Sequence, residues 1–194
     1  MVRRWLLAVL LAGCGHEAEA PVPATPATPP PAPLPPPRNL DEACARWKCR
    51  PETRVKLETP EGNYETTVGR TVYSDGTVVR ILAGEKMVVT GDIQGEQLVN
   101  LRVADAAADR DVLLLSFEQK KLKSGPSMIL RVDNRFPRNV KYRAGMELPT
   151  RKGFKGTSSC AVMAGKFGLE MWPHPIVSIM MKDFRFIDDK VPCD

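Results

Sequence analysis

The chain has 194 residues, a formal net charge of +5 and two histidines, and aromatic side chains make up 6% of it. The apolar run from Trp5 to Leu11 rises only about 10 Å as a helix, which is too short to span a bilayer. The sequence contains no G-x-S-x-G, H-E-x-x-H, Walker or G-x-G-x-x-G motif, which excludes the enzyme classes that depend on them.

The first thirteen residues are ordered like an export signal, with a basic start, an apolar run and small residues before a cysteine. The residues Leu11-Ala12-Gly13-Cys14 resemble the lipobox of bacterial lipoproteins. The resemblance implies that the signal peptide 1–13 is removed, that Cys14 carries lipid and that several acyl chains anchor the protein to a membrane. In lipoproteins of this type, an Asp directly after the cysteine signals retention in the inner membrane. Gly15 stands at that position, so the resemblance implies the outer membrane, with the domain facing the periplasm.

A lipidated N-terminus and proline-rich linker are expected at residues 14–39. Between positions 21 and 37, ten of seventeen residues are proline, so a packed core cannot form there. An extended polyproline-type segment of that length spans roughly 50 Å at about 3.1 Å per residue. We expect either a semi-rigid stalk or a disordered linker, and both hold residues 40–194 away from the membrane.

Residues 40–194 are expected to form one domain, because about 155 residues suffice for a single core. Polar and apolar residues alternate along many short segments, which is typical of half-buried strands. The clearest strands run over 99–103, 128–132, 140–146 and 167–171, and 104–109 is the expected short helix or turn. Short strands at this spacing predict an all-β fold, an antiparallel β-sandwich or barrel, and we favour an immunoglobulin-like sandwich.

Four cysteines remain once Cys14 is assigned to lipid: Cys44, Cys49, Cys160 and Cys193. An even number in an exported domain predicts disulfide bonds. We favour Cys44–Cys49 with Cys160–Cys193, because the first pair shares a short segment and the second would fix the C-terminus to the sandwich. The sequence leaves the crossed pairings open. The Cys44 and Cys49 spacing lacks the second pair of ligands that a structural zinc site needs.

Positive charge is concentrated between residues 119 and 155, which hold eleven Lys or Arg against two acids. If 128–132 and 140–146 pair as a hairpin, most of this charge falls on one basic face. The candidate partner-binding residues of that face are Lys120, Lys121, Lys123, Arg131, Arg135, Arg138, Lys141 and Arg143. An anionic envelope polymer or an acidic envelope protein fits such a face, and nucleic acid does not fit an exported protein. The competing interpretation is that the charges only keep exposed strands soluble.

His174 lies in the rigid segment Trp172-Pro173-His174-Pro175, close in sequence to Met171 and Met180. Imidazole and thioether groups suit copper(I), so periplasmic copper handling is the alternative function. Methionine is also a common core residue, and we expect no metal or other cofactor. The function we favour is that of a non-enzymatic binding or scaffolding module in the cell envelope.

Cys14→Ser removes the thiol that would receive the lipid. We predict that the variant stays uncleaved or is released in soluble form, which membrane fractionation and mass spectrometry of the N-terminus measure. A Cys14→Ser protein that has lost residues 1–13 and still sediments with membranes after a high-salt wash would contradict the lipoprotein interpretation.

Overall fold

The computed structural model describes residues 35–105, 110–188 and 193. The chain divides into two compact units, residues 1–35 and 36–194, and the second is the folded domain. The predicted signal peptide 1–13, the predicted lipid site Cys14 and linker residues 14–34 lie outside the described residues, as does most of the predicted helix or turn at 104–109. No helix in the described part of the chain is long and apolar enough to cross a membrane.

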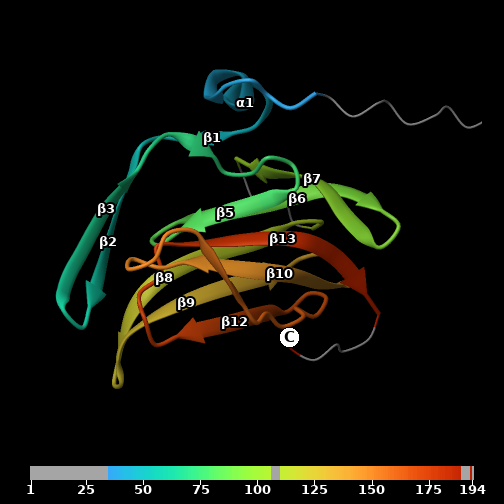
Figure 1. The fold of residues 1–194 in the computed structure, drawn as a ribbon. Helices are drawn as coiled ribbons and strands as arrows, with labels where there is room; N and C mark the ends of the chain where they lie inside the picture. Colours follow the sequence, from blue (N-terminus) through green and yellow to red (C-terminus); the bar gives the residue numbers. More distant parts are fainter. Residues whose placement is uncertain (1–34, 106–109, 189–192, 194) are drawn as a thin grey trace, which may run out of the picture. The chain divides into compact units, whose positions relative to one another are not determined.

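Within the described ranges, the domain consists of one short helix and thirteen strands (Figure 1). They are α1 (Leu40–Arg46), β1 (Cys49–Arg50), β2 (Thr53–Thr59), β3 (Gly62–Val68), β4 (Thr71–Val72), β5 (Val78–Leu82), β6 (Lys86–Gln94), β7 (Gln97–Ala104), β8 (Leu113–Leu122), β9 (Gly125–Asn134), β10 (Asn139–Glu147), β11 (Phe154–Thr157), β12 (Phe167–Trp172) and β13 (Ser178–Ile187). The helix begins where the Asn39 side chain accepts a hydrogen bond from the backbone N–H of Glu42, a common N-cap.

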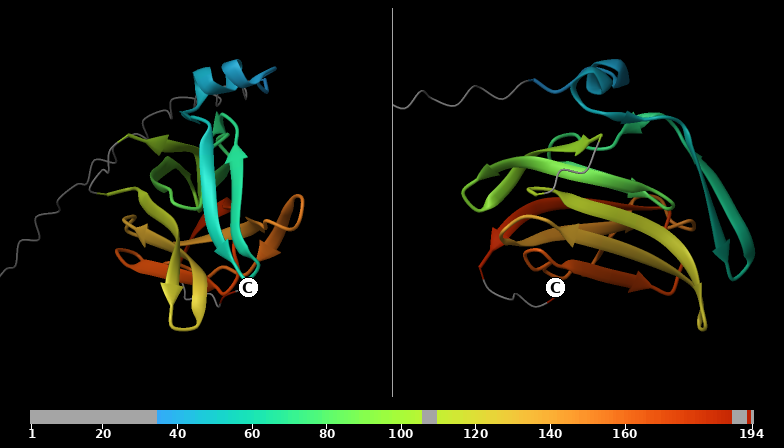
Figure 2. Two further views of the ribbon diagram at one scale, coloured as in Figure 1. Left: turned by 90° about the vertical axis from the view of Figure 1, so that its left-hand side faces the viewer. Right: turned by 180° about the vertical axis from the view of Figure 1, so that it is seen from behind.

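Nine strands form one antiparallel sheet in the order β11-β10-β13-β7-β6-β8-β9-β12, with β5 also paired to β13. The sheet curls into a half-barrel around one apolar core, as the end-on view shows (Figure 2). This confirms the predicted all-β, antiparallel, sandwich-like fold. An immunoglobulin-like sandwich has two separate sheets, whereas here all nine strands belong to one.

Two β-bulges strengthen the curl of the sheet. Strand β7 has one extra residue opposite positions 90–92 of β6, and β13 has one opposite positions 141–143 of β10. At each bulge a residue takes a positive φ, +50° at Asn100 and +54° at Asp183. Asn and Asp tolerate this left-handed conformation better than other residues with a side chain. Because a bulge bends its strand and increases the local twist, the sheet turns around the core there.

The hairpin of 128–132 with 140–146, on which the single basic face depended, does not form, although both segments are strands. Strand β9 pairs with β8 and β12, and β10 pairs with β11 and β13. Leu122 pairs directly with Gly125, so only two residues connect β8 to β9. Such a short turn favours this local hairpin over one that must bridge the longer β9–β10 loop.

Strands β2 and β3 form a separate two-stranded hairpin beside the large sheet. Val55 and Leu57 of β2 are buried in the common core. The side-chain amide of Gln119, in β8, donates to the Glu58 carbonyl at 2.9 Å and accepts from the Glu58 N–H at 2.7 Å. These contacts fasten the hairpin across one end of the half-barrel (Figure 2).

Both favoured disulfide bonds are confirmed. Cys44–Cys49 joins α1 to β1, and Cys160–Cys193 joins the β11–β12 connection to the C-terminal residues. Each bridge fixes a segment at the margin of the domain. Such covalent links are typical of proteins in oxidising compartments.

Arg50 is a fully buried charge between the N-terminal segment and the sheet. Its guanidinium donates to the two carboxylate oxygens of Glu85 at 2.9 and 2.8 Å and to the Arg80 carbonyl at 2.6 Å. It also lies 4.5 Å from the centroid of the Tyr73 ring. Because Arg50 follows Cys49 directly and Glu85 lies in the β5–β6 turn, this pair holds the disulfide-bonded segment against the sheet.

Arg50→Met should lower the free energy of unfolding by about 3–5 kcal/mol, because it leaves the Glu85 carboxylate largely buried without its cationic partner. Adding Glu85→Gln should recover part of that loss, since the uncompensated charge is removed. Denaturant unfolding of the parent and both variants measures the differences. Equal stability of the parent and Arg50→Met would contradict the structural role of the pair.

Candidate binding groove

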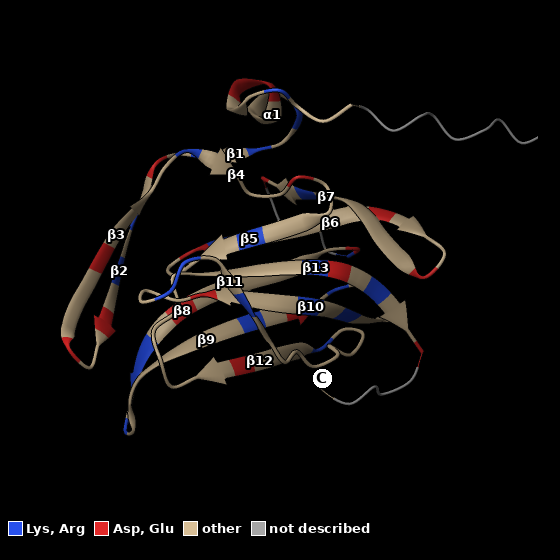
Figure 3. Cartoon of the chain, in the orientation of Figure 1, with Lys and Arg blue, Asp and Glu red and all other residues tan. Residues whose placement is uncertain are grey.

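The residues predicted to form one basic face are dispersed over the domain (Figure 3). Lys141 was placed wrongly: its side chain is 2% exposed and donates a hydrogen bond to the Ser159 carbonyl. It is buried because alternation along β10 breaks opposite the β13 bulge, and the β11–β12 connection covers it. A residue in that position cannot contact a partner at the surface.

Four other members of the predicted face form ion pairs, namely Lys120–Glu118, Arg131–Asp133, Arg138–Asp188 and Arg143–Asp183, at 2.9, 2.7, 3.5 and 3.6 Å. Arg135 is half-buried in the β9–β10 loop. Lys121 and Lys123 are exposed at the tip of the β8–β9 hairpin. The charge counted along the sequence is therefore locally neutralised over much of the sheet.

Three exposed cations between residues 148 and 157 were not singled out from the sequence: Arg151, Lys152 and Lys155. They lie on the β10–β11 connection and on β11 itself. Among the described residues, none of the three has an acidic partner at ion-pair distance. The signal for them was present in the sequence, because positions 148–157 contain three cations and no acid.

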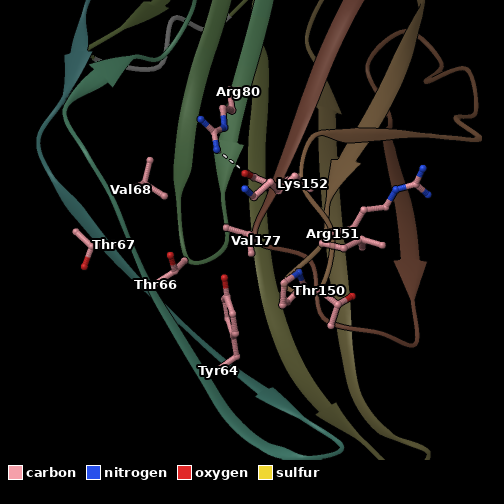
Figure 4. Close-up of a pocket in the computed structure, with 12 residues that line it drawn as sticks. Tyr64, Thr66, Thr67, Val68, Arg80, Thr150, Arg151, Lys152 and Val177 are labelled. Carbon is pink, nitrogen blue, oxygen red and sulfur yellow. Dashed lines mark hydrogen bonds and ion pairs between the residues drawn. The ribbon is translucent and has the colours of Figure 1, made fainter.

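This cationic connection forms one wall of a groove with a volume of about 530 Å³ (Figure 4). Strand β3 forms the opposite wall, where the hydroxyl groups of Tyr64 and Thr66 point into the space between the walls. Val177 lies between the two walls. Most of the lining residues are half-buried or exposed, so the groove is open to solvent.

An ion pair closes one end of the groove and fixes the charge there. Arg80 donates to a carboxylate oxygen of Glu147 at 2.5 Å, and the Ser178 hydroxyl donates to the same oxygen at 2.7 Å. Because Arg80 and Glu147 neutralise each other, Arg151 and Lys152 leave the lining with a net charge of +2 (three cations minus one acid). The groove therefore combines hydroxyl groups with an excess of positive charge.

The residues of the copper alternative lie on different elements. His174 is half-buried between β12 and β13, Met171 is exposed on β12, and Met180 is half-buried on β13. Strands β12 and β13 are not neighbours in the sheet. In the described part of the chain, no three His, Cys, Asp or Glu residues gather as metal ligands. The imidazole and the two thioethers therefore come from three different segments of the chain.

A buried polar cluster lies where the two ends of the curled sheet approach each other. Glu170 of β12 accepts hydrogen bonds from the Tyr142 hydroxyl at 2.8 Å and from the Cys160 N–H at 3.2 Å. Burial raises the pKa of Glu170 above its usual value, although these two hydrogen bonds oppose the shift. Burial also raises the pKa of Tyr142 well above its usual range, so the phenol stays protonated and donates. None of these residues lines the groove.

The raised pKa of Glu170 makes part of the stability depend on pH. The folded carboxyl holds its proton more tightly than the unfolded one, so stability falls as the pH rises above the unfolded value of 4.5 and through the folded pKa. We predict that the melting temperature of Glu170→Gln, relative to the parent, increases over this window. Thermal unfolding across pH 4–8 measures it, with Glu61→Gln as an exposed control, and a difference that stays constant with pH would contradict the prediction.

Comparison with known proteins does not assign the chain to a family. No family model matches the chain, and neither does any curated protein or solved structure with which it was compared. A function must therefore be inferred from the surface of the domain itself. Its candidate site is an open groove with hydroxyl groups on one wall and, on the other, cations that have no acidic partner among the described residues.

Proposed function

We propose that this chain is a lipid-anchored protein of the cell envelope whose domain binds an anionic envelope component in the groove, without catalysing a reaction. The observation that carries the proposal is that Arg151 and Lys152 belong to the lining of the groove, across from the hydroxyl groups of β3, and have no acidic partner among the described residues. The guanidinium of Arg151 extends away from β3 (Figure 4). The lipid anchor follows from the resemblance of residues 11–14 to a lipobox.

The two disulfide bonds support the envelope as the compartment. Disulfides persist in oxidising surroundings such as the bacterial periplasm and are rare in the cytosol. A chain whose domain is cross-linked at both margins is suited to that environment, and a lipid at position 14 would hold it there. Both features agree with an exported, membrane-attached protein.

The groove offers an anion two kinds of contact. Arg151 and Lys152 supply positive charge, and a guanidinium can bind a carboxylate or phosphate through two parallel hydrogen bonds. The hydroxyls of Tyr64, Thr66 and Thr150 can donate to further oxygens of the same ligand. An acidic polymer, or an acidic segment of a protein, satisfies both kinds of contact along an open groove.

The ion pair at the end of the groove supports a binding role over a catalytic one. The Glu147 oxygen that faces Arg80 already accepts from two donors, which makes it a poor general base. The pair also links β5 to the end of β10. A fixed, charge-neutral end with cations beside it is suited to holding an anion in place.

Replacing Arg151 and Lys152 by Gln should weaken binding of a polyanion without unfolding the domain. Each lost contact should lower affinity roughly tenfold, because a hydrogen bond to a charged group contributes about 1.5–3 kcal/mol. Titration of the chain with polyphosphate and with polyglutamate, at low and high salt, measures the effect. The two probes separate phosphate from carboxylate ligands.

The matched control replaces two other exposed cations, Lys182 and Arg185, by Gln and so removes the same charge elsewhere. The control should bind the polyanions almost as well as the parent. Equal loss of affinity in both double variants would show that net charge, rather than the groove, attracts the polyanion.

A further inference from the structure

Large apolar side chains are exposed in a row on strand β12. Phe167, Leu169 and Met171 are 54%, 52% and 62% exposed. They alternate with Gly168, Glu170 and Trp172, which point to the inside of the half-barrel, and Trp172 belongs to the core. The apolar side of this strand therefore faces solvent, and its inner side carries the buried carboxyl.

Neighbouring strands extend this surface. Residues directly opposite each other in an antiparallel pair lie on the same face, and Met171 is opposite Ile129 of β9, which is opposite Glu118 of β8. Two steps of alternation along β8 from Glu118 place Leu122, 40% exposed, on that face as well. We call the surface formed by Leu122, Ile129, Phe167, Leu169 and Met171 the apolar face. Four of the seven large hydrophobic side chains exposed in the described domain lie on it.

The charges within the apolar face neutralise each other. Arg131 binds both carboxylate oxygens of Asp133 at 2.9 and 2.7 Å and lies 4.2 Å from the centroid of the Phe167 ring. Lys120 pairs with Glu118 at 2.9 Å. Side chains in such pairs carry little net charge, so the centre of the face is apolar and nearly neutral.

The margin of the apolar face is positive. Lys123 is exposed in the turn directly after Leu122, at the tip of the β8–β9 hairpin, where cationic residues are visible in Figure 3. Lys166 is exposed directly before Phe167 at the start of β12. In the described domain, neither of these two lysines has an acid at ion-pair distance. An apolar centre with a cationic margin complements a membrane surface, where acyl chains lie beneath anionic headgroups.

We propose that the apolar face rests on the surface of a lipid bilayer that contains anionic lipids. This proposal depends on the proposed function in one respect only: the chain is taken to be attached to that membrane by its lipid. Twenty residues separate Cys14 from Pro35, and a segment of that length reaches roughly 60 Å when extended at about 3.1 Å per residue. An anchored domain therefore has enough chain to turn this face to the bilayer.

Charge argues against a second copy of the chain as the occupant. Two apolar faces placed together would also bring their lysine margins together, and like charges repel. The groove remains accessible in the proposed contact, because none of its lining residues belongs to β8, β9 or β12. The apolar face and the groove are thus separate surfaces with separate ligands.

A solvent-sensitive dye placed on the apolar face tests the contact. The probe is nitrobenzoxadiazole on Leu169→Cys in the full chain carrying Cys14→Ser, mixed with phosphatidylcholine vesicles with and without phosphatidylglycerol. The matched control carries the dye on Ile93→Cys, which is 51% exposed on the β6–β7 hairpin away from the face. We expect the emission to brighten and shift to the blue at position 169 with anionic vesicles, and to stay unchanged at position 93.

Changing Lys123 and Lys166 to Gln should weaken the vesicle affinity reported by the dye at position 169, by roughly fivefold for each charge removed. Replacing Lys182 and Arg185 by Gln, which removes the same charge elsewhere, should change it little. Equal spectral changes at positions 169 and 93, or none at either, would overturn the proposal. A blue shift without vesicles that grows with protein concentration would also overturn it, by identifying a second copy as the occupant. These vesicle results are independent of the polyanion titrations, so failure of one proposal does not imply failure of the other.

Discussion

The curl of the nine-strand sheet is the constraint on which the rest of the domain depends. Strand β13 pairs with β10 along one edge, and along the other it pairs first with β5 and then, at Arg185, with β7. One strand therefore joins three others, and its bulge at Asp183 lies where the sheet must turn. Without the bulges at Asn100 and Asp183, a flatter sheet would leave one side of its large apolar residues exposed to water. The core and both candidate surfaces follow from that turn.

The curl brings the two ends of the sheet near each other, and side chains connect them. Trp172 of β12 donates to the Thr157 hydroxyl of β11 at 3.0 Å, and Glu170 of β12 accepts from Tyr142 of β10. Because β12 turns these polar side chains inward, its alternate residues must point outward, and those are the large apolar ones. The exposed apolar face is thus coupled to the closure of the half-barrel. The β2–β3 hairpin, fastened by Gln119, covers one end of the half-barrel and forms a wall of the groove.

Local patterns in the sequence were enough to predict strands and disulfide bonds, but not how the strands pair. Alternation identified residues 140–146 and 167–171 as strands because period-two patterning is a local property. Which face of a strand meets the core depends on distant partners, so alternation alone could not show that Phe167 points outward while Trp172 points inward. The prediction that Lys141 is exposed was wrong for a related reason. The register changes opposite the β13 bulge, and no local sequence pattern indicates that bulge. The groove could not be predicted around Arg151 and Lys152, because its opposite wall, β3, is some eighty residues away in the sequence.

Photo-crosslinking in intact cells tests the central claim, that the domain holds an anionic envelope component in its groove. A photoreactive amino acid replaces Thr66, whose side chain points into the groove from the β3 wall, and in a matched strain replaces Gln94, which is exposed on the β6–β7 hairpin. The account predicts an adduct with an acidic polymer or an acidic protein segment from position 66 that high salt suppresses, and none from position 94. Absence of an adduct from position 66, or equal adducts from both positions, would contradict it.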